Sequence, residues 1–299
     1  MNKKRQLTLL LFSIIAMLVT ILSFTFIINP TAQPRQEESI ATEETSTSMS
    51  STSIVETTKP SEEPTQTPWI QVEGEVSLPI LMYHDTKGTP GDNNSIDISL
   101  FEQHLIALKE AGFYTLTPEE AYKVLTTNSK PAPKVVWITF DDGYRDFYEN
   151  VFPILQKYQM KATNFAITST TQAPHHLSLE QMKEMKASNL VSIQSHTVSH
   201  LDLSTLTNEQ QLSELKDSKE FLDTNLGQNT IALCFPAGRF NDDTLIIAKQ
   251  AQYQLAVTTQ PGFATLTSGL LTLPRIRIFP TTSAENLVAS ISLAFVDGN

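Results

Sequence analysis

The chain of 299 residues is long enough for one large domain with additional segments. Its formal net charge of −11 argues against a surface that binds nucleic acid. The single cysteine, Cys234, excludes an intrachain disulfide and a thiol-rich metal site, and its apolar neighbours indicate a core residue.

The N-terminus has the pattern of a membrane anchor. Lys3, Lys4 and Arg5 precede residues 7–28, which contain no charged residue. As a helix, this apolar run would span about 33 Å, enough to cross the hydrocarbon core of a bilayer. We expect residues 1–29 to form an uncleaved transmembrane anchor with a cytoplasmic N-terminus, and the alternative is a cleavable signal peptide. The remainder would then lie outside the cell membrane, facing the cell wall.

Residues 30–68 consist largely of serine, threonine, glutamate and proline and contain no aromatic residue. This composition predicts a disordered tether with a root-mean-square span of about 35 Å. We therefore divide the chain into an anchor (1–29), a tether (30–68) and a globular domain (69–299).

From residue 78 onward, apolar runs typical of strands alternate with patterns typical of helices. Strands are expected at 78–84, 113–116, 135–140, 162–167, 190–194, 230–235, 255–258 and 273–278. Helices are expected after the capping patterns at Ser99, Thr117, Ser178, Thr207, Asn241 or Asp242, and Ser283, and over residues 147–158. These repeated units favour an α/β fold with a parallel (β/α) barrel over an open doubly wound sheet.

Two carboxylates and a glycine follow the buried strand at 135–140. Catalytic groups of α/β folds gather at the carboxyl ends of strands, and Gly143 allows a tight turn beside a ligand. Adjacent side chains of an extended chain cannot point the same way, so Asp141 and Asp142 are expected to have different roles. The alternative is an ordinary Asp-Gly turn in which one aspartate caps the next helix.

Two histidines four residues apart follow the strand at 190–194. We expect His196 and His200 to lie on one side of a helical turn, the spacing used when both bind one metal ion. Together with one carboxylate they would form a set of three protein ligands that leaves coordination positions open. The alternative is a pair of solvated or core histidines without a ligand.

Two motifs, Thr139-Phe140-Asp141-Asp142-Gly143 and His196-Thr197-x-x-His200, resemble the first two motifs of the polysaccharide deacetylase family (NodB homology, carbohydrate esterase family 4). The resemblance covers roughly residues 78–280 and implies a distorted barrel of about seven parallel strands. It implies that Asp142, His196 and His200 hold one divalent metal ion, with zinc expected and cobalt or nickel as alternatives. It also implies that Asp141 is the general base.

The proton donor departs from the family pattern, because no histidine follows His200. Residues 81–84, however, resemble the N-terminal histidine strand of the exopolysaccharide deacetylase branch, in which the barrel order is circularly permuted. First and last strands of a closed barrel are neighbours, so His84 could occupy the same place in space. We expect His84 to be the general acid; the alternative is a strand-end histidine bonded to the backbone.

The third motif is also altered. An arginine normally precedes Pro-x-Gly by two residues and orients the base, and Cys234 stands there instead. Some other cation is needed beside Asp141, and of Arg275 and Arg277 we expect only one to face the centre. We select Arg275; the alternative is that both are surface arginines. No equivalent of the family's fourth motif is evident, so the partner that tunes His84 is not identified.

The resemblance implies hydrolysis of N-acetyl groups from a polymer containing N-acetylglucosamine, with peptidoglycan and poly-N-acetylglucosamine both open as substrates. The candidate oxyanion and substrate residues are Ala237, Gly238 and Tyr144, and Ala237 would act through its backbone N–H. One alternative is an O-acetyl esterase acting on a glycan; another is a non-catalytic glycan-binding or assembly protein. We expect a polysaccharide and the membrane as partners, without nucleic acid or a partner protein.

Overall fold

The computed structural model describes residues 68–295. The expected membrane anchor at 1–29 and nearly all of the expected tether at 30–68 lie outside the described residues, as do residues 296–299. Among the helices of the described part, none has both the length and the apolar character needed to cross a bilayer.

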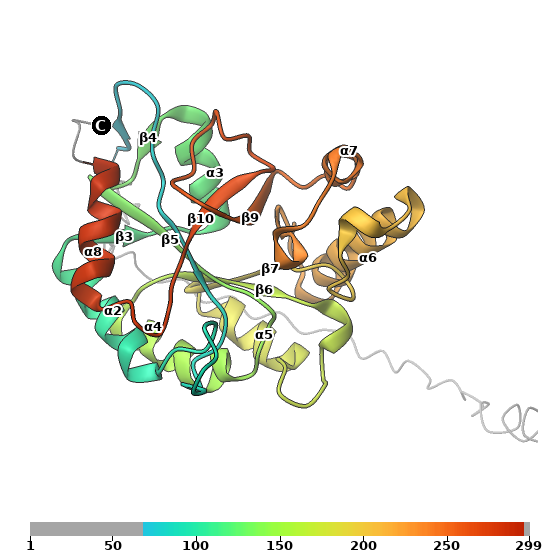
Figure 1. Ribbon diagram of the computed structural model, residues 1–299, viewed down its shortest axis with the longest axis horizontal. Helices are drawn as coiled ribbons and strands as arrows, with labels where there is room; N and C mark the ends of the chain where they lie inside the picture. Colours follow the sequence, from blue (N-terminus) through green and yellow to red (C-terminus); the bar gives the residue numbers. More distant parts are fainter. Residues whose placement is uncertain (1–67, 296–299) are drawn as a thin grey trace, which may run out of the picture. The chain divides into compact units, whose positions relative to one another are not determined.

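Seven parallel strands form a closed barrel, as the sequence predicts (Figure 1). They are β2 (Ile80–Tyr83), β5 (Lys134–Phe140), β6 (Ala162–Ala166), β7 (Val191–Ser195), β8 (Ala232–Cys234), β9 (Leu255–Pro261) and β10 (Leu273–Arg277). A further strand, β3 (Phe113–Thr115), pairs with the first half of β5. A separate antiparallel pair joins β1 (Ile70–Gln71) to β4 (Ser129–Lys130) and was not expected from the sequence.

The first barrel strand closes the barrel between β5 and the last strand. On one side Ile80 of β2 is in register with Trp137 of β5, and on the other Leu81 is in register with Ile276 of β10. Strands distant in sequence are therefore neighbours in space. This arrangement is the one required for His84, at the end of β2, to stand beside residues of β5 and β10.

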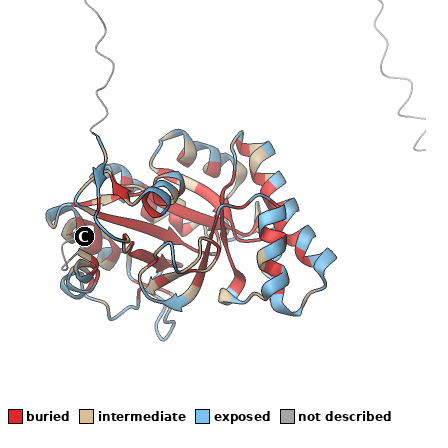
Figure 2. Cartoon of the chain, turned by 90° about the horizontal axis from the view of Figure 1, so that it is seen from above, coloured by how far each residue is buried: buried red, intermediate tan, exposed pale blue. Residues whose placement is uncertain are grey.

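The barrel strands are largely buried (Figure 2), and their side chains alternate between the inside of the barrel and the surrounding helices. Trp137 and Phe165 belong to a buried cluster that fills the barrel, and both are fully buried. Ile138 and Phe140 belong to the cluster formed with the helices. Phe140 stacks against Tyr83 with ring centroids 4.9 Å apart. The apolar run of β5 is therefore buried on both faces, as expected for a strand of a parallel barrel.

The helices are α2 (Ile98–Glu110), α3 (Pro118–Thr127), α4 (Phe152–Tyr158), α5 (Leu179–Ala187), α6 (Asn208–Leu226), α7 (Asp242–Gln250) and α8 (Ala284–Ser292). Capping boxes at Thr117, Ser178 and Thr207 begin α3, α5 and α6, which confirms those predicted starts. The predicted cap at Ser99 is wrong. Asp97 is the N-cap of α2, and its carboxylate accepts a hydrogen bond from the Ser99 N–H at 2.8 Å.

The expected helix over 147–158 begins with a π-helical segment. Residues Phe147–Val151 form that segment, and regular α-helix follows only from Phe152. Pro153 has no N–H to donate, and it lies in the first turn of α4, where that N–H is not needed. The proline therefore marks a boundary between two helical segments.

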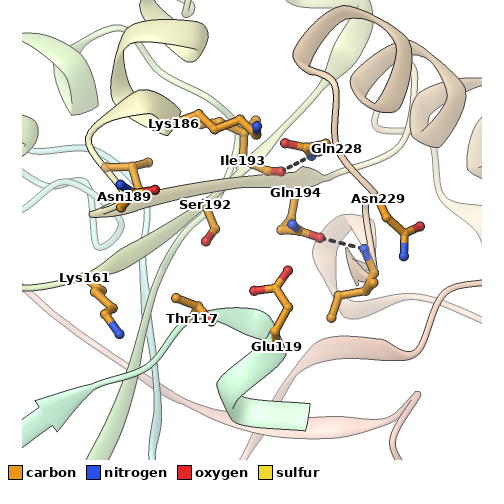
Figure 3. A pocket seen from close by; sticks show the side chains of 12 residues that line it. Thr117, Glu119, Lys161, Lys186, Asn189, Ser192, Ile193, Gln194, Gln228 and Asn229 are labelled. Atoms are coloured by element: carbon orange, nitrogen blue, oxygen red, sulfur yellow. Dashed lines mark hydrogen bonds between the residues drawn. The ribbon is translucent and has the colours of Figure 1, made fainter. Parts of the chain in front are cut away.

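Strands β7 and β8 separate toward their starts. Their backbones are in register only at Ser195 and Leu233. Closer to the start of the strands, Gln194 Oε1 accepts hydrogen bonds from the N–H groups of Ile231 and Ala232, at 3.0 and 2.8 Å. Two glutamine side chains thus bridge the separated strands, since Gln228 Nε2 also donates to the carbonyl of Ile193 in β7 (Figure 3).

Candidate active site

Asp141 and Asp142 point to different sides because the backbone turns between them. Asp142 has φ 73° and Gly143 has φ 69°, two consecutive left-handed conformations directly after β5. A Cβ at residue 143 would lie 3.2 Å from the Cα of Ala166, so glycine is needed there for space as well as for conformation. The structure therefore supports separate roles for the two carboxylates.

Asp142, His196 and His200 form a group suited to one metal ion. Asp142 Oδ1 lies 3.3 Å from His196 Nε2 and 3.6 Å from His200 Nε2. One donor atom of each residue lies within 4.8 Å of the others. Two ligands of a tetrahedral zinc ion with bonds near 2.1 Å are separated by roughly 3.4 Å, so the donor spacing fits such an ion.

The expected helical turn between the two histidines is wrong. Residues 196–200 form a loop in which Thr197 has φ 66° and His200 has φ 56°. The Thr197 hydroxyl accepts a hydrogen bond from the His200 N–H at 3.0 Å, and Glu214 accepts one from the Ser199 N–H at 2.8 Å. These bonds hold a strained loop that brings both imidazoles to Asp142.

Hydrogen bonding sets the orientation of His196. Its Nδ1 lies 2.7 Å from the carbonyl oxygen of Cys234, so Nδ1 carries the proton and donates it. Nε2 is then the nitrogen that faces Asp142 and that would bind a metal ion, as in metal-binding histidines oriented by a backbone carbonyl. A second group of potential ligands, Asp141 with His196 and Cys234, is less suitable because Arg275 occupies both oxygens of Asp141.

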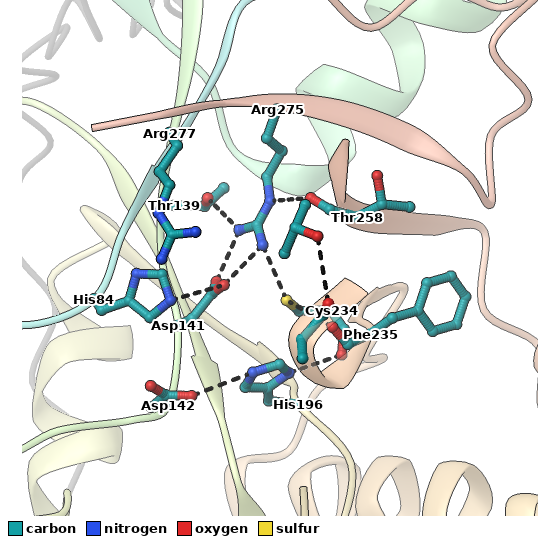
Figure 4. Close-up of polar contacts among 12 residues, drawn as sticks. His84, Thr139, Asp141, Asp142, His196, Cys234, Phe235, Thr258, Arg275 and Arg277 are labelled. Atoms are coloured by element: carbon teal, nitrogen blue, oxygen red, sulfur yellow. Dashed lines mark hydrogen bonds and ion pairs between the residues drawn. The ribbon is translucent and has the colours of Figure 1, made fainter. Parts of the chain in front are cut away.

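Arg275 is the cation beside Asp141 (Figure 4). Its Nη1 and Nη2 donate to Oδ1 and Oδ2 of Asp141 at 2.8 and 2.7 Å, and its side chain is fully buried. Nε donates to the carbonyl of Thr258, and the remaining donors reach Thr139 and the sulfur of Cys234. Burial alone would raise the pKa of Asp141, but the charge and hydrogen bonds of Arg275 hold it well below its usual value.

The expectation that only one of the two arginines faces the centre is wrong. Residues two apart on a strand lie on the same face, and Arg277 lines the same cavity as Asp141 and His84. Arg277 donates a hydrogen bond to the side-chain oxygen of Asn94 and lies near the ring of Phe279. The two arginines differ in depth: Arg275 is buried and Arg277 is exposed at the rim.

His84 lies beside Asp141 in the same cavity as the candidate metal-binding group. Its Nε2 is 4.0 Å from Asp141 Oδ2, and its side chain is 16% exposed. Burial lowers the pKa of His84, and the charges of Asp141 and Asp142 oppose that shift. The first barrel strand thus places an imidazole at the cavity, in the position that the permuted order predicts.

A cavity of about 260 Å³ contains these groups. Its lining comprises His84, Asn94, Asp141, Asp142, His196, His200, Ala237, Thr259 and Arg277. Asn94, Thr259 and Arg277 were not among the expected site residues. Asn94 and Thr259 follow no motif, and only the even spacing of Arg277 from Arg275 could have indicated its position.

The turn at Ala237 and Gly238 brings one backbone N–H to the cavity. Gly238 donates its N–H to the carbonyl of Phe235, whereas within residues 68–295 the N–H of Ala237 has no protein acceptor. A Cβ at Gly238 would lie 2.2 Å from the hydroxyl of Thr259. Gly238 therefore permits the close packing of the turn, and Ala237 is the residue whose N–H is free to contact a substrate.

Tyr144 lies beside the metal-binding group. Burial, the charge of Asp142 and a hydrogen bond to Asp142 all raise the pKa of the Tyr144 hydroxyl. Its ring lies against His176, with centroids 5.3 Å apart, and under the ammonium of Lys87 at 4.7 Å. Tyr144 therefore lies close to Asp142, although it is not among the residues that line the cavity.

The chain matches the family model described as polysaccharide deacetylase over residues 128–256. It is 45% identical over 223 residues to the putative polysaccharide deacetylase YxkH of Bacillus subtilis, covering 75% of this chain and 79% of that protein. It is 31% identical over 201 residues to a poly-β-1,6-N-acetyl-D-glucosamine N-deacetylase of Staphylococcus aureus, covering 62% of this chain and 68% of that one. The chain therefore belongs to the polysaccharide deacetylase family.

Solved structures agree. The deacetylase PplD of Streptococcus pyogenes, in complex with acetate, is 47% identical with a TM-score of 0.71, and the match covers 73% of this chain and 99% of that one. The putative polysaccharide deacetylase BA0330 of Bacillus anthracis is 34% identical with a TM-score of 0.67, covering 73% and 69%. These relatives share both the barrel and a substantial part of the sequence.

Proposed function

We propose that this protein hydrolyses N-acetyl groups of a polysaccharide containing N-acetylglucosamine, in a reaction that depends on one divalent metal ion. The observation that carries the proposal is that Asp141, bonded to Arg275, shares one cavity with His84 and with the group Asp142, His196 and His200. Similarity to a relative named as a poly-β-1,6-N-acetyl-D-glucosamine N-deacetylase supports the same substrate class.

The residues divide the work of amide hydrolysis. Asp142, His196 and His200 would hold the ion, for which zinc is the expected identity. When bound, such an ion polarises an acyl oxygen and lowers the pKa of water to near 7. The unligated Asp141, kept ionised by Arg275, accepts the proton of the attacking water.

The other two requirements are an oxyanion donor and an acid. The free N–H of Ala237 is placed at the cavity to donate to the developing oxyanion. His84 donates a proton to the leaving amine, which is a poor leaving group without it. Burial lowers the pKa of His84, which makes its protonated form a stronger acid than a free imidazolium.

The test uses the full chain with added zinc, cobalt or nickel, incubated with β-1,6-linked N-acetylglucosamine oligomers or with peptidoglycan fragments. We expect mass spectrometry to show loss of acetyl groups and new free amines, and Asp141→Asn to abolish both. Product from one polymer alone would identify the substrate. Glycan binding that survives Asp141→Asn, without turnover of any acetylated glycan, would identify a binding protein instead.

We also propose that the catalytic domain works outside the cell membrane, attached through residues 1–29. The basic residues Lys3, Lys4 and Arg5 followed by an uncharged apolar run support this location. Fractionation of cells, with protease added to intact cells, tests it. The domain should be found in the membrane fraction of untreated cells and should be degraded when protease is added to intact cells. Recovery in the medium would indicate a cleaved signal peptide.

A further inference from the structure

A second cavity lies at the end of the barrel where the strands begin. It has a volume of about 580 Å³, and its lining includes Lys161, Val191 and Ile231, which begin or directly precede β6, β7 and β8. The candidate active site instead follows the strand ends, at Asp141 and His196. Because the strands are parallel, the two cavities lie at opposite ends of the barrel.

One strand contributes to both cavities. Ser192 and Gln194 lie on the same face of β7, because side chains alternate along a strand, and His196 directly follows its end. Ser192 and Gln194 line the second cavity and His196 lines the first. The fully buried rings of Trp137 and Phe165, with centroids 6.2 Å apart, fill the barrel interior. A ligand bound in the second cavity would therefore be separated from the candidate active site and would not react there.

Gln194 presents a fixed donor to the second cavity. Its side chain is 3% exposed, and Oε1 is oriented by the N–H groups of Ile231 and Ala232. The amide nitrogen must then point the other way, and within the described chain Nε2 has no protein acceptor. This nitrogen is therefore available to donate to a ligand or a water in the cavity.

Other groups around the cavity provide hydrogen-bonding partners of both kinds (Figure 3). The Ser192 hydroxyl lies beside Gln194 on the same strand and the Glu119 carboxylate faces them from α3, and neither has a partner among residues 68–295. Gln228 uses Nε2 for the carbonyl of Ile193 and the hydroxyl of Thr230, so its Oε1 is left as an acceptor. A molecule with several hydroxyl groups could satisfy this arrangement.

The charges around the cavity offset one another. The ammonium of Lys161 lies 2.8 Å from the carboxylate of Glu120 and is therefore neutralised. Lys186 and Glu119 contribute one charge of each sign. An anion would meet a carboxylate in the cavity and a cation would meet an ammonium. This balance favours an uncharged ligand.

We propose that this cavity binds an uncharged saccharide unit. Nε2 of Gln194 donates to a sugar oxygen, while Ser192 and Glu119 accept from sugar hydroxyls. The volume lies within the range of about 300–1,000 Å³ typical of small-molecule sites. Binding here does not depend on the proposed hydrolysis, and it would give the protein a second contact with a glycan.

Hydrogen–deuterium exchange measured by mass spectrometry can separate the two sites. The full-length chain in detergent, without metal so that the ligand stays acetylated, is titrated with a β-1,6-linked N-acetylglucosamine disaccharide. We expect slower exchange in peptides covering 189–194 and 228–232. Peptides covering 141–146 and 196–200 report on the candidate active site independently.

Ser192→Leu fills the cavity and should weaken the protection of residues 189–194 at least ten-fold. Ser213→Leu, at an exposed position of α6, is the matched control and should leave the protection unchanged. If Ser192→Leu fails to fold, the exposed Glu119→Ala serves instead, with several-fold weaker protection expected.

Absence of protection at 189–194, or equal protection in Ser192→Leu, would overturn the proposal. Protection by inorganic phosphate alone would overturn it as well, because it would show an anion site. Protection at 189–194 without protection at 196–200 would support the second site independently of the proposed function.

Discussion

Arg275 and Asp141 lie 134 positions apart and are joined by two hydrogen bonds of 2.8 and 2.7 Å. In the family resemblance that role belongs to an arginine just before Pro-x-Gly, the place that Cys234 occupies here. The guanidinium reaches Asp141 from a different strand, and the cysteine sulfur lies 3.3 Å from it. The same electrostatic partner is thus supplied from another position in the barrel.

Arg275→Met should leave Asp141 as a buried carboxylate without a cation. We expect its pKa to rise, acetate release to fall by at least 100-fold, and the free energy of unfolding to decrease by about 3–5 kcal/mol. Urea titration and an acetate assay measure the two effects. Arg239→Met removes an exposed ion pair with Asp202 and is the matched control, for which stability should change by less than about 1 kcal/mol.

Metal binding should require His200. We expect His200→Ala to lower bound zinc, measured by mass spectrometry of metal content after dialysis, and to lose the increase in melting temperature that zinc gives the wild type. Chelation should abolish activity, and added zinc should restore it. His175→Ala, at an exposed loop position, is the control. Undiminished zinc content in His200→Ala would show that the ion is held elsewhere.

His84→Gln should affect amides more than esters. An amine needs a proton to leave, whereas an alkoxide is a better leaving group, so we expect a 100- to 10,000-fold loss in kcat on N-acetylated oligomers. Hydrolysis of an O-acetylated sugar should fall much less. Equal losses on the two substrates would argue against His84 as the acid.

His104 should make stability depend on pH. Its ring is fully buried between the Tyr83 hydroxyl at 3.0 Å and the Thr282 carbonyl at 2.8 Å. Burial lowers the pKa of His104 and the bond to Thr282 only partly opposes this. The unfolded chain therefore binds the proton first, and stability is lost as pH falls below about 6.5.

Urea titrations at pH 7.5 and 5.5 measure this loss. In His104→Gln the difference between the two pH values should be smaller than in the wild type. An unchanged difference would assign the pH dependence to other groups.

Asp146 connects the loop after β5 to the segment after His84. Its Oδ2 accepts hydrogen bonds from the N–H and hydroxyl of Thr86 at 2.6 and 2.8 Å. We expect Asp146→Ala to lower kcat on the amide substrate by roughly ten-fold while zinc content stays unchanged, because only the position of His84 is disturbed. Thr86→Val, which keeps the backbone bond, should have a smaller effect. Loss of zinc in Asp146→Ala would show a wider structural role.

Much of the site could be predicted because each motif directly follows a strand. Asp141, Asp142 and His196 needed only the strand ends to be located, and the parallel barrel then brought them together. The loop from His196 to His200 could not be predicted, because left-handed conformations at non-glycine residues depend on hydrogen bonds to distant groups such as Glu214.

The positions of site residues that belong to no motif depend on how the strands are staggered. Asn94 and Thr259 reach the cavity from a long loop and from the end of β9, and neither position follows from local pattern. The prediction that Arg275 and Arg277 face different ways was wrong, because residues two apart on a strand lie on the same face. The start of α2 also could not be predicted from local pattern. Asp97 is its N-cap, although Ser99 offered an equally good local pattern.

The strand that carries Arg275 is the last one of the barrel to leave the ribosome. Until β10 has been synthesised, Asp141 has no cation beside it and β2 lacks one of its two neighbours. A chain that stops before residue 273, or one trimmed back to that point by a protease, would therefore be inactive while still containing both sequence motifs. Hydrolysis would therefore require that the last barrel strand has been synthesised and retained.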